Sequence, residues 1–335
     1  MVTIKDVADL AGVSSSTVSR VLNDRNYIKE ETRQKVQGAM NALGYKPSRL
    51  ARGLRSNKSR IIGLIISDIQ NPFFTGLVRA VEDIAHENNY ALILANADED
   101  PQKEELNVDL MISERVAGVI ITPTKEYNCP VKKLINNKIP VVCVDRRILD
   151  CDVDIVLLDN VSASKNLVDH LLSMNHRRIG AILGPSDVTT GRERLLGMKN
   201  AFEEKNIPLD ENLILQSMPK EENGYKLAHE LFALADPPTA IFAGNNLLAL
   251  GAMRAIKELG LKIPDDISMV SFDDSTWSEL VQPSITVVAQ PTYEIGRIAA
   301  ELIMRRIEDI NCSVTTVMLE SQVLFRESVL PLVTI

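Results

Sequence analysis

Near the N-terminus, apolar residues recur every three or four positions, which is the spacing of amphipathic helices. This pattern predicts helices over residues 4–11, 15–23 and 30–43. Thr3 and Ser14 stand just before the first two helices, where a hydroxyl can cap the free backbone N–H groups. Two short helices joined by a tight turn and covered by a third predict a helix-turn-helix fold.

Beyond residue 60 the pattern changes to short, wholly apolar runs that alternate with longer amphipathic segments. The apolar runs predict buried strands at 61–66, 91–95, 119–121, 141–144, 179–183, 240–243 and 268–272. The amphipathic segments predict helices at 73–88, 101–114, 193–204, 222–234 and 247–259. Strands that alternate with helices form parallel sheets with helices on both faces, so the fold class is α/β. The alternation occurs as two similar series, which predicts two doubly wound lobes behind an all-α N-terminal headpiece.

Charge is distributed unevenly along the chain. The whole sequence carries a net charge of −8, but residues 1–60 hold twelve Lys or Arg against five Asp or Glu and so carry +7. The remaining residues therefore carry −15. A basic segment on an acidic body predicts a polyanionic partner at one end only. The alternative is a solvated basic face with no partner.

Other features of the sequence narrow the class of protein. The N-terminus is charged and amphipathic and lacks the apolar core of a signal peptide. No uninterrupted apolar run approaches the ~18 residues of a membrane span. The four cysteines show neither C-x-x-C pairing nor a spacing with histidine that suits a metal. We therefore expect reduced thiols in a cytoplasmic protein that needs no metal or cofactor and contacts no membrane.

The second predicted helix has an outward face of small polar residues and one arginine, namely Ser15, Ser16, Ser19, Arg20 and Asn23. Short hydroxyl side chains permit close approach to base edges, and arginine binds guanine through two hydrogen bonds. We therefore expect this helix to enter the major groove of DNA. The alternative for the first two serines is helix capping, although Ser14 already supplies a cap.

Several segments of the headpiece closely resemble the lactose-repressor/galactose-repressor family of bacterial transcriptional regulators: residues 3–8, 11–14, 17–23, 32–33, 43–47 and 51–55. In that family the residues that match Ser15, Ser16 and Arg20 read bases in the major groove. The stretch 48–55 resembles the family's hinge helix, whose leucine, matching Leu54, inserts into the minor groove at the operator centre. The alternative for this leucine is a linker residue that packs on its own lobe. The full set of expected DNA contacts is Thr3, Ser14, Ser15, Ser16, Ser19, Arg20, Asn23, Ala51, Leu54 and Arg55.

The body resembles the periplasmic-binding-protein type of sensor that this family joins to its headpiece, through residues 67–74, 176–180, 244–251, 272–274 and 289–291. The resemblance implies a headpiece over 1–47, a hinge helix and linker over 48–60, and an effector-binding body over 61–335. It also implies that the chain crosses between lobes near Asn160, Gln290 and Glu320. The N-lobe then comprises about 61–160 and 291–320, and the C-lobe about 161–290 and 321–335.

Expected effector contacts follow predicted strands, where doubly wound folds bind small molecules. The resemblance assigns two aromatics that pack on a ligand ring, an arginine that donates hydrogen bonds, and polar residues that hold hydroxyls: Phe73, Phe74, Arg194, Asn245, Asp273 and Gln290. Arg146 is added because it follows the predicted strand that ends at Asp145. The alternatives are that the aromatics belong to the core and that Arg146 or Arg192 is a surface salt-bridge partner. This chemistry suits a sugar or sugar derivative, and several arginines near one cleft would also suit an acidic sugar or a phosphate ester.

The expected function is ligand-controlled repression of carbohydrate-metabolism genes, by a homodimer that binds a palindromic operator in double-stranded DNA. A periplasmic sugar carrier would share the body but would have a signal peptide and no headpiece. An enzyme would need a nucleophile or nucleotide motif, and the sequence has no G-x-S-x-G, G-x-G-x-x-G or phosphate-loop pattern. We therefore expect a protein that binds without catalysing a reaction.

Overall fold

The computed structural model of the protein describes residues 2–22, 28–45, 59–127 and 129–332. Its contacts divide the chain into two compact units, Met1–Ser59 and Arg60–Ile335. No helix in the described ranges is both long enough and apolar enough to cross a membrane.

The N-terminal unit is a three-helix headpiece with α1 (Ile4–Ala11), α2 (Ser15–Leu22) and α3 (Glu30–Leu43). Thr3 caps α1 in a reciprocal arrangement with Asp6, which satisfies backbone N–H groups at the start of the helix. The helices share one small apolar core, made by Val7, Ala8, Val18, Val21, Val36, Ala39 and Met40. The predicted helix-turn-helix is therefore present, with its second helix described as far as Leu22.

The first lobe of the body, the N-lobe, is built on a six-stranded parallel sheet. The strand order is β11 (Thr316–Leu319), β5 (Asp154–Leu158), β4 (Val141–Val144), β3 (Gly118–Ile121), β1 (Ile61–Ile66) and β2 (Ala91–Asn96). Alternate side chains of a strand face opposite sides of the sheet, so both faces need a cover. Helices α5 (Phe73–Glu87) and α13 (Thr292–Glu308) cover one face, and α6 (Pro101–Ser113) and α7 (Val131–Asn136) cover the other.

The second lobe, the C-lobe, repeats this plan with one antiparallel edge strand. Its strand order is β12 (Gln322–Leu324), β10 (Thr286–Ala289), β9 (Ser268–Phe272), β8 (Ala240–Ala243), β6 (Ile179–Leu183) and β7 (Ile214–Gln216). Helices α8 (Asn160–Ser173) and α9 (Thr189–Glu204) cover one face, and α10 (Glu221–Phe232) and α11 (Asn246–Glu258) cover the other. The short elements η1 (Glu211–Leu213) and α12 (Thr276–Leu280) lie in its connections.

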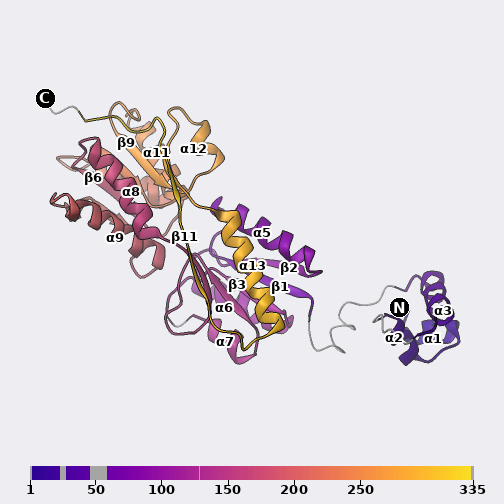
Figure 1. The fold of residues 1–335 in the computed structure, drawn as a ribbon. Coiled ribbons are helices and arrows are strands. Elements are labelled where there is room, and N and C mark those ends of the chain that lie inside the picture. The colour runs from indigo at the N-terminus through magenta and orange to yellow at the C-terminus, as the bar shows by residue number, and fades with distance from the viewer. Residues whose placement is uncertain (1, 23–27, 46–58, 128, 333–335) are drawn as a thin grey trace. The chain divides into compact units, whose positions relative to one another are not determined.

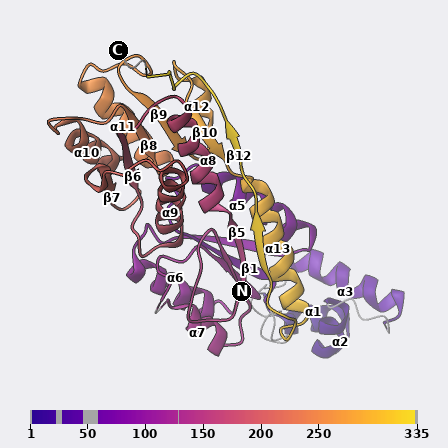
Figure 2. The same cartoon turned by 60° about the vertical axis from the view of Figure 1, so that its left-hand side comes forward.

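The chain passes between the lobes three times: after β5, after β10 and after β11. Figures 1 and 2 show the late segment, coloured yellow, running from one lobe to the other. As a result α13 packs against α5, and the Tyr293 hydroxyl donates a hydrogen bond to the Asp83 carboxylate across 210 residues of sequence. Neither lobe is therefore a continuous stretch of the chain.

The expected α/β class and the long apolar strands agree with the structure, but several elements differ from the prediction. The sequence pattern missed the strands β5, β7, β10 and β11 and the helices α8, α12 and α13. Helix α9 begins at Thr189 rather than at residue 193. Its first turn contains Gly191, where a Cβ would overlap the Pro185 carbonyl oxygen, so a tight turn rather than helix propensity determines where the helix begins.

Close packing of α10 on α11 generates a testable prediction. A Cβ at Gly251 would overlap the Glu221 carbonyl oxygen and lie 2.5 Å from the Tyr225 nitrogen, whereas a Cβ at Gly38 in α3 would meet nothing within 4 Å. We expect Gly251→Ala to lower the free energy of unfolding of the body by about 1–3 kcal/mol, because backbone must move apart. The matched Gly38→Ala change should stabilise the headpiece by about 0.5–1 kcal/mol. Urea unfolding followed by circular dichroism measures both, and an unchanged body in Gly251→Ala would refute the packing argument.

Candidate functional site

A cavity lies between the lobes, where the carboxyl ends of the two sheets face each other. The loops that follow β1, β2 and β4 supply one wall, and the loops that follow β6, β7, β8 and β9 supply the opposite wall. The cavity has a volume of about 40 Å³, several times the roughly 10–15 Å³ that one water molecule requires. It therefore has room for a small molecule held between the lobes.

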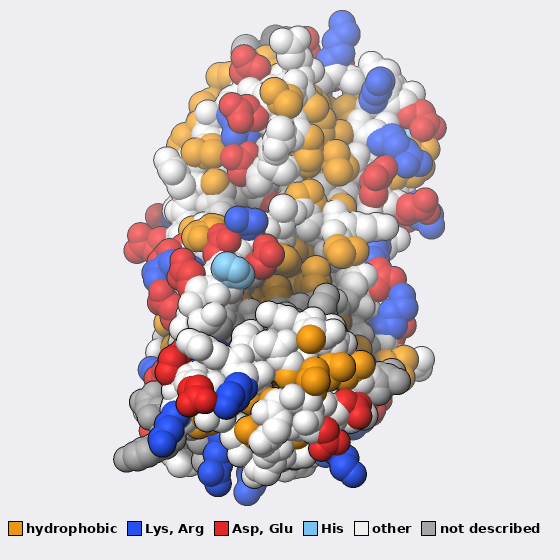
Figure 3. Space-filling view, turned by 90° about the vertical axis from the view of Figure 1, so that its right-hand side faces the viewer, with side chains coloured by type: hydrophobic (Ala, Val, Ile, Leu, Met, Phe, Trp, Pro, Cys, Tyr) orange, Lys and Arg blue, Asp and Glu red, His pale blue; other side chains and the backbone are white. Residues whose placement is uncertain are grey.

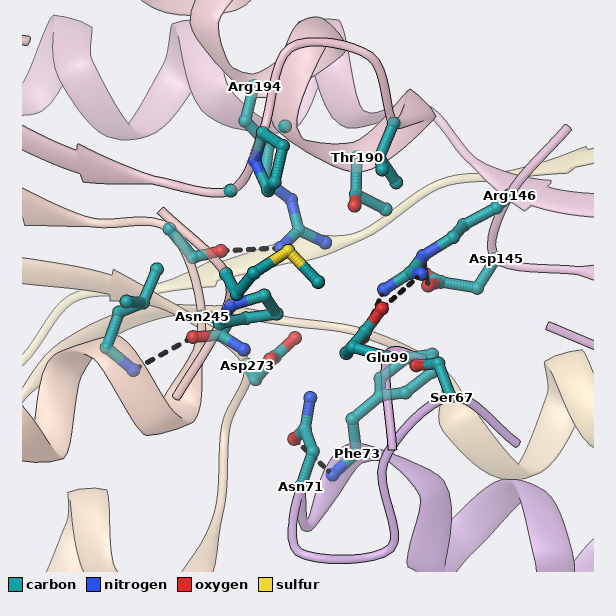
Figure 4. A pocket seen from close by; sticks show the side chains of 18 of the residues that line it. Ser67, Asn71, Phe73, Glu99, Asp145, Arg146, Thr190, Arg194, Asn245 and Asp273 are labelled. Carbon is teal, nitrogen blue, oxygen red and sulfur yellow. Dashed lines mark hydrogen bonds and ion pairs between the residues drawn. The ribbon is translucent and has the colours of Figure 1, made fainter. Parts of the chain in front are cut away.

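The structure brings all of the expected effector residues to this cavity: Phe73, Phe74, Arg146, Arg194, Asn245, Asp273 and Gln290 all line it. Figure 4 shows the labelled side chains converging on one space from both lobes. Arg192, two positions before Arg194, does not belong to the lining. Its guanidinium instead makes two hydrogen bonds of 2.7 Å to Glu126 of the N-lobe, which is the salt-bridge alternative raised for it.

The aromatic residues serve both the core and the cavity. Phe73 and Phe74 open α5, belong to the apolar core of the N-lobe and are each 4% exposed. Their ring centroids lie 5.0 Å apart in an edge-to-face arrangement, which fixes one ring against the other. The two interpretations considered from the sequence, core and ligand wall, are thus compatible here.

Arg146 is held by a carboxylate of its own lobe. Its Nη1 and Nη2 atoms donate to the two Glu99 oxygens at 2.7 and 2.6 Å, and Nη1 also donates to the Pro123 carbonyl oxygen at 3.2 Å. Burial raises the pKa of Glu99, but the Arg146 guanidinium outweighs that effect and holds the pKa below its ordinary value. The pair is therefore an ionised, bidentate couple, and its charges cancel.

Arg194 enters the cavity from α9 without a carboxylate directly bonded to it. Its Nε donates to the Asn160 amide oxygen at 3.0 Å and its Nη1 to the Gly244 carbonyl oxygen at 2.5 Å. The guanidinium carbon lies 3.9 Å from the centre of the Phe272 ring, a cation–π contact. Burial lowers the pKa of Arg194, but an arginine remains charged because its ordinary pKa is so high.

Asp273 and Asn245 lie on the same wall as Arg194. The Gln290 amide donates to Asp273, whose backbone has a φ of 71° that places the carboxylate at the end of β9. Burial raises the pKa of Asp273, and the Arg194 guanidinium works in the opposite direction. The Asn245 amide oxygen caps α11 by accepting from the Leu248 N–H, which leaves its NH2 group for other partners.

Asp145 is a cavity residue that the sequence analysis missed. Burial raises its pKa to about 6, against an ordinary value of 3.8, although Arg146 acts to lower it. The nearest cationic atom is Arg146 Nε at 3.7 Å, and neither carboxylate oxygen accepts a hydrogen bond within the described part of the chain. Its position directly after the β4 strand was a usable signal, because the same position identified Arg146. Glu99 was also missed, although its position soon after β2 offered a similar signal.

The cavity is lined by side chains of both charges. Two arginines face three carboxylates, so the lining carries a net negative charge when all three are ionised. Among the described residues that line the cavity, none is a histidine, cysteine or lysine. In the same described part of the chain, no group of His, Cys, Asp and Glu is placed to hold a metal ion. The carboxylates, guanidinium groups and amides of the lining can form hydrogen bonds with a ligand.

The headpiece presents the expected DNA-contacting side chains on α1 and α2. Ser14 caps α2, and its hydroxyl lies 2.7 Å from that of Ser16 and 2.9 Å from that of Thr17. Arg20 and Ser16 are exposed, Ser15 and Ser19 are half-buried, and Thr3 is occupied in capping α1. The remaining expected contacts, Asn23, Ala51, Leu54 and Arg55, lie outside the described residues.

Asp145 gives a prediction with a defined pH dependence. Its pKa is about 6 in the folded protein, against an ordinary value of 3.8. Between these pH values the folded state binds a proton more readily than the unfolded state does. Ionisation of Asp145 therefore lowers the free energy of unfolding. Above pH 6 this loss amounts to about 1–3 kcal/mol, and it disappears as the pH falls towards 4. We therefore expect Asp145→Asn to be more stable than the parent at pH 8 and equal to it near pH 4.

Urea unfolding of both proteins between pH 4 and 8 tests this expectation. The exposed Asp152 provides the control, since Asp152→Asn should change stability little at any pH. An Asp145→Asn protein that is less stable than the parent at pH 8 would show that the arginines, not burial, dominate at this carboxylate.

Comparison with known proteins agrees with this architecture. Residues 3–48 match the lacI family of bacterial regulatory proteins, and residues 168–329 match a periplasmic binding protein-like domain. The chain is 40% identical over 314 residues to the "Probable HTH-type transcriptional regulator EndR" of Paenibacillus polymyxa, with 91% of each protein covered. It is similar to the lac repressor dimer bound to operator and the anti-inducer ONPF, with a TM-score of 0.84, 26% identity, and 98% of this chain and 99% of that chain covered. It is also similar to the transcriptional regulator CelR in its cellobiose complex, with a TM-score of 0.74, 30% identity, and 98% and 100% coverage. The chain therefore belongs to the lacI family of bacterial regulatory proteins, which are DNA-binding transcriptional regulators.

Proposed function

We propose that this protein represses genes of carbohydrate metabolism and that an uncharged, polyhydroxylated molecule bound in the cavity controls its affinity for operator DNA. The observation that carries the proposal concerns Asp145, whose carboxylate lies 3.7 Å from Arg146 Nε but accepts no hydrogen bond from the described residues, while the arginines beside it already have partners. A buried carboxylate needs hydrogen-bond donors, and sugar hydroxyls supply them.

The charges of the cavity favour a neutral ligand over an acidic one. Arg146 is neutralised by Glu99, so it offers little attraction to an added phosphate or carboxylate. A negatively charged ligand would instead add to the three carboxylates of the lining. A hydroxyl can donate to Asp145 or Asp273 and also accept from Arg194, whose Nη2 has no acceptor among the described residues. A neutral sugar therefore suits the cavity better than an acidic sugar or a phosphate ester does.

The rings of Phe73 and Phe74 suit the apolar face of such a ligand, and Asn245 and Gln290 suit its polar rim. The similar regulator CelR holds cellobiose, which supports a saccharide here. In this proposal the cavity residues hold the ligand through hydrogen bonds and ring contacts, and no reaction on the ligand is required.

For the DNA end, we propose that α2 enters the major groove of a palindromic operator and that the stretch 48–55 forms the hinge helix, with Leu54 at the minor groove. The exposed Arg20 and the short hydroxyl side chains beside it support this placement. The similar lac repressor was solved on its operator, and a bacterial regulator that binds operator DNA acts in the cytoplasm. The proposed divisions are a headpiece over 1–47, a hinge and linker over 48–60, and the two-lobed body after residue 60.

We also propose that the protein is a homodimer, as the similar lac repressor is. The N-lobe has an apolar edge that supports this: β2 is the last strand of its sheet and leaves Leu94 41% exposed. Helix α6, which packs against β2, leaves Leu106 69% and Leu110 44% exposed. Natural proteins usually cover or charge such a sheet edge, and a second copy would cover it here. On the face drawn in Figure 3, acidic and basic side chains are intermixed.

The ligand class is testable by thermal shift. We expect neutral saccharides such as D-ribose, D-glucose or cellobiose to include a ligand that raises the melting temperature by about 5–10 °C at a hundredfold excess over its Kd. The corresponding sugar phosphates should raise it less. Asp273→Asn should abolish the shift, whereas Asp274→Asn, a change at a neighbour that pairs with Arg326 outside the cavity, should retain it. Stabilisation by phosphates alone would contradict the proposal.

The DNA face is testable with a matched pair of charge changes. Arg20→Ala should weaken binding to an operator selected from random DNA by about 1–3 kcal/mol and relax the preference at one base pair. Lys35→Ala removes the same charge from α3, where Lys35 pairs with Glu31 at 2.8 Å, and should leave sequence preference intact. Gel-shift titrations on operator and scrambled DNA measure both, and equal loss of selectivity in the two variants would argue against α2 as the reading helix.

A further inference from the structure

One lysine joins the two lobes beside the cavity without lining it. Lys220 lies between β7 and α10 in the C-lobe, and its Nζ lies 2.7 Å from Asp68 Oδ2 and 2.5 Å from Asp98 Oδ1. Asp68 follows β1 and Asp98 follows β2, so both carboxylates belong to the N-lobe. Asp68 is almost wholly buried, with 2% of its side chain exposed, so its pairing with Lys220 is sheltered from water.

The backbone at Asp98 is in a conformation that side-chain-bearing residues rarely adopt. Asp98 has a φ of 56° and Glu99 a φ of 58°, two consecutive residues in the left-handed region. Such a conformation persists only where surrounding contacts enforce it. The contacts here include the Lys220 and Lys103 ammonium groups on Asp98 and the Arg146 guanidinium on Glu99. They also include a 2.7 Å hydrogen bond from the Glu99 N–H to the Ser67 carbonyl oxygen.

These contacts form a chain from the lobe interface to the cavity wall. Lys220 of the C-lobe holds Asp98, the backbone carries that constraint to Glu99, and Glu99 orients the Arg146 guanidinium through two hydrogen bonds. Other contacts between the lobes lie elsewhere or act on Arg147. Arg192 and Thr189 bind Glu126, and Asn246 binds Asn71. Arg147 binds Thr189 through its backbone N–H and pairs with Glu193, but none of these contacts touches Asp98 or Glu99.

We propose that Lys220 is a positioning residue that couples closure of the lobes to the geometry of Arg146 in the cavity. The assignment of Arg146 to an effector site rests on the proposed function, but the coupling itself does not. When the lobes separate, Asp98 loses the ammonium of the opposite lobe, the left-handed pair relaxes, and Arg146 loses the fixed orientation of its partner. Because coupling is reciprocal, a ligand that orders Arg146 also favours the closed arrangement.

The chain contains a matched control for this proposal. Lys103 of α6 binds the other oxygen of the same carboxylate, Asp98 Oδ2, at 2.7 Å, but it belongs to the same lobe as Asp98. Removing either lysine charge perturbs Asp98 electrostatically, and only the removal of Lys220 breaks a contact between lobes. The two substitutions therefore separate lobe coupling from local charge.

Hydrogen–deuterium exchange of the full-length protein without ligand or DNA tests the proposal. In Lys220→Met, the segments 97–100 and 145–146 should exchange about tenfold faster than in the parent, because the constraint on both is released. Lys103→Met should exchange at the parent rate, and Lys220→Arg should restore protection. Asp98→Asn, in which the amide tolerates the left-handed backbone, should reproduce the Lys220→Met pattern.

Three outcomes would overturn the proposal: parent rates in Lys220→Met, equal acceleration in Lys103→Met, or acceleration spread evenly over α8 and α13 as well. If Lys220→Met does not fold, the same readings on Asp98→Asn decide the matter. Because the exchange experiment contains neither saccharide nor operator, its result does not depend on whether the proposed ligand class or DNA contacts are correct.

Discussion

Five charged side chains among the described residues line the buried cavity between the two lobes, and each loses most of its hydration there. Desolvation of an ion is expensive unless an opposite charge or several hydrogen bonds replace the water. Arg146 finds Glu99, and Arg194 finds a carbonyl oxygen, an amide oxygen and an aromatic face. Asp145 has the Arg146 Nε atom at 3.7 Å, but its carboxylate accepts no hydrogen bond within the described part of the chain. A ligand that binds in the cavity therefore has to supply the hydrogen-bond donors that the Asp145 carboxylate lacks.

The fold concentrates these charges because parallel strands end together. Each βα loop begins where a strand leaves the sheet, so residues that are distant in sequence meet along one edge. Two sheets that face each other at those edges bring together Glu99 after β2, Arg146 after β4 and Asp273 after β9. The same arrangement supplies the lobe contacts, since Lys220 and Glu126 also stand in loops at this edge. Binding and lobe closure therefore depend on the same set of loops.

This geometry also explains what could be predicted from sequence. Buried parallel strands are continuous apolar runs, so β1, β4, β6, β8 and β9 were predicted at or within a residue of their observed ends. Candidate residues after those strands were predictable for the same reason. The pairing of Arg146 with Glu99 was not, because it spans 47 residues and depends on the order of strands in the sheet. The short edge strand β7 was hard to predict because its three residues carry too little pattern.

The position of α13 has a consequence for how the protein is made. The N-lobe core takes Ile295, Ala299 and Ile303 from this helix, and its sheet takes its last strand from β11. A ribosome adds about 5–20 residues per second, so roughly ten to fifty seconds separate the emergence of β1 from that of α13. During that interval the first lobe to be synthesised has an uncovered apolar face, while the second lobe, begun later, is already nearly complete. The nascent chain is therefore most exposed to aggregation in the half that was translated first.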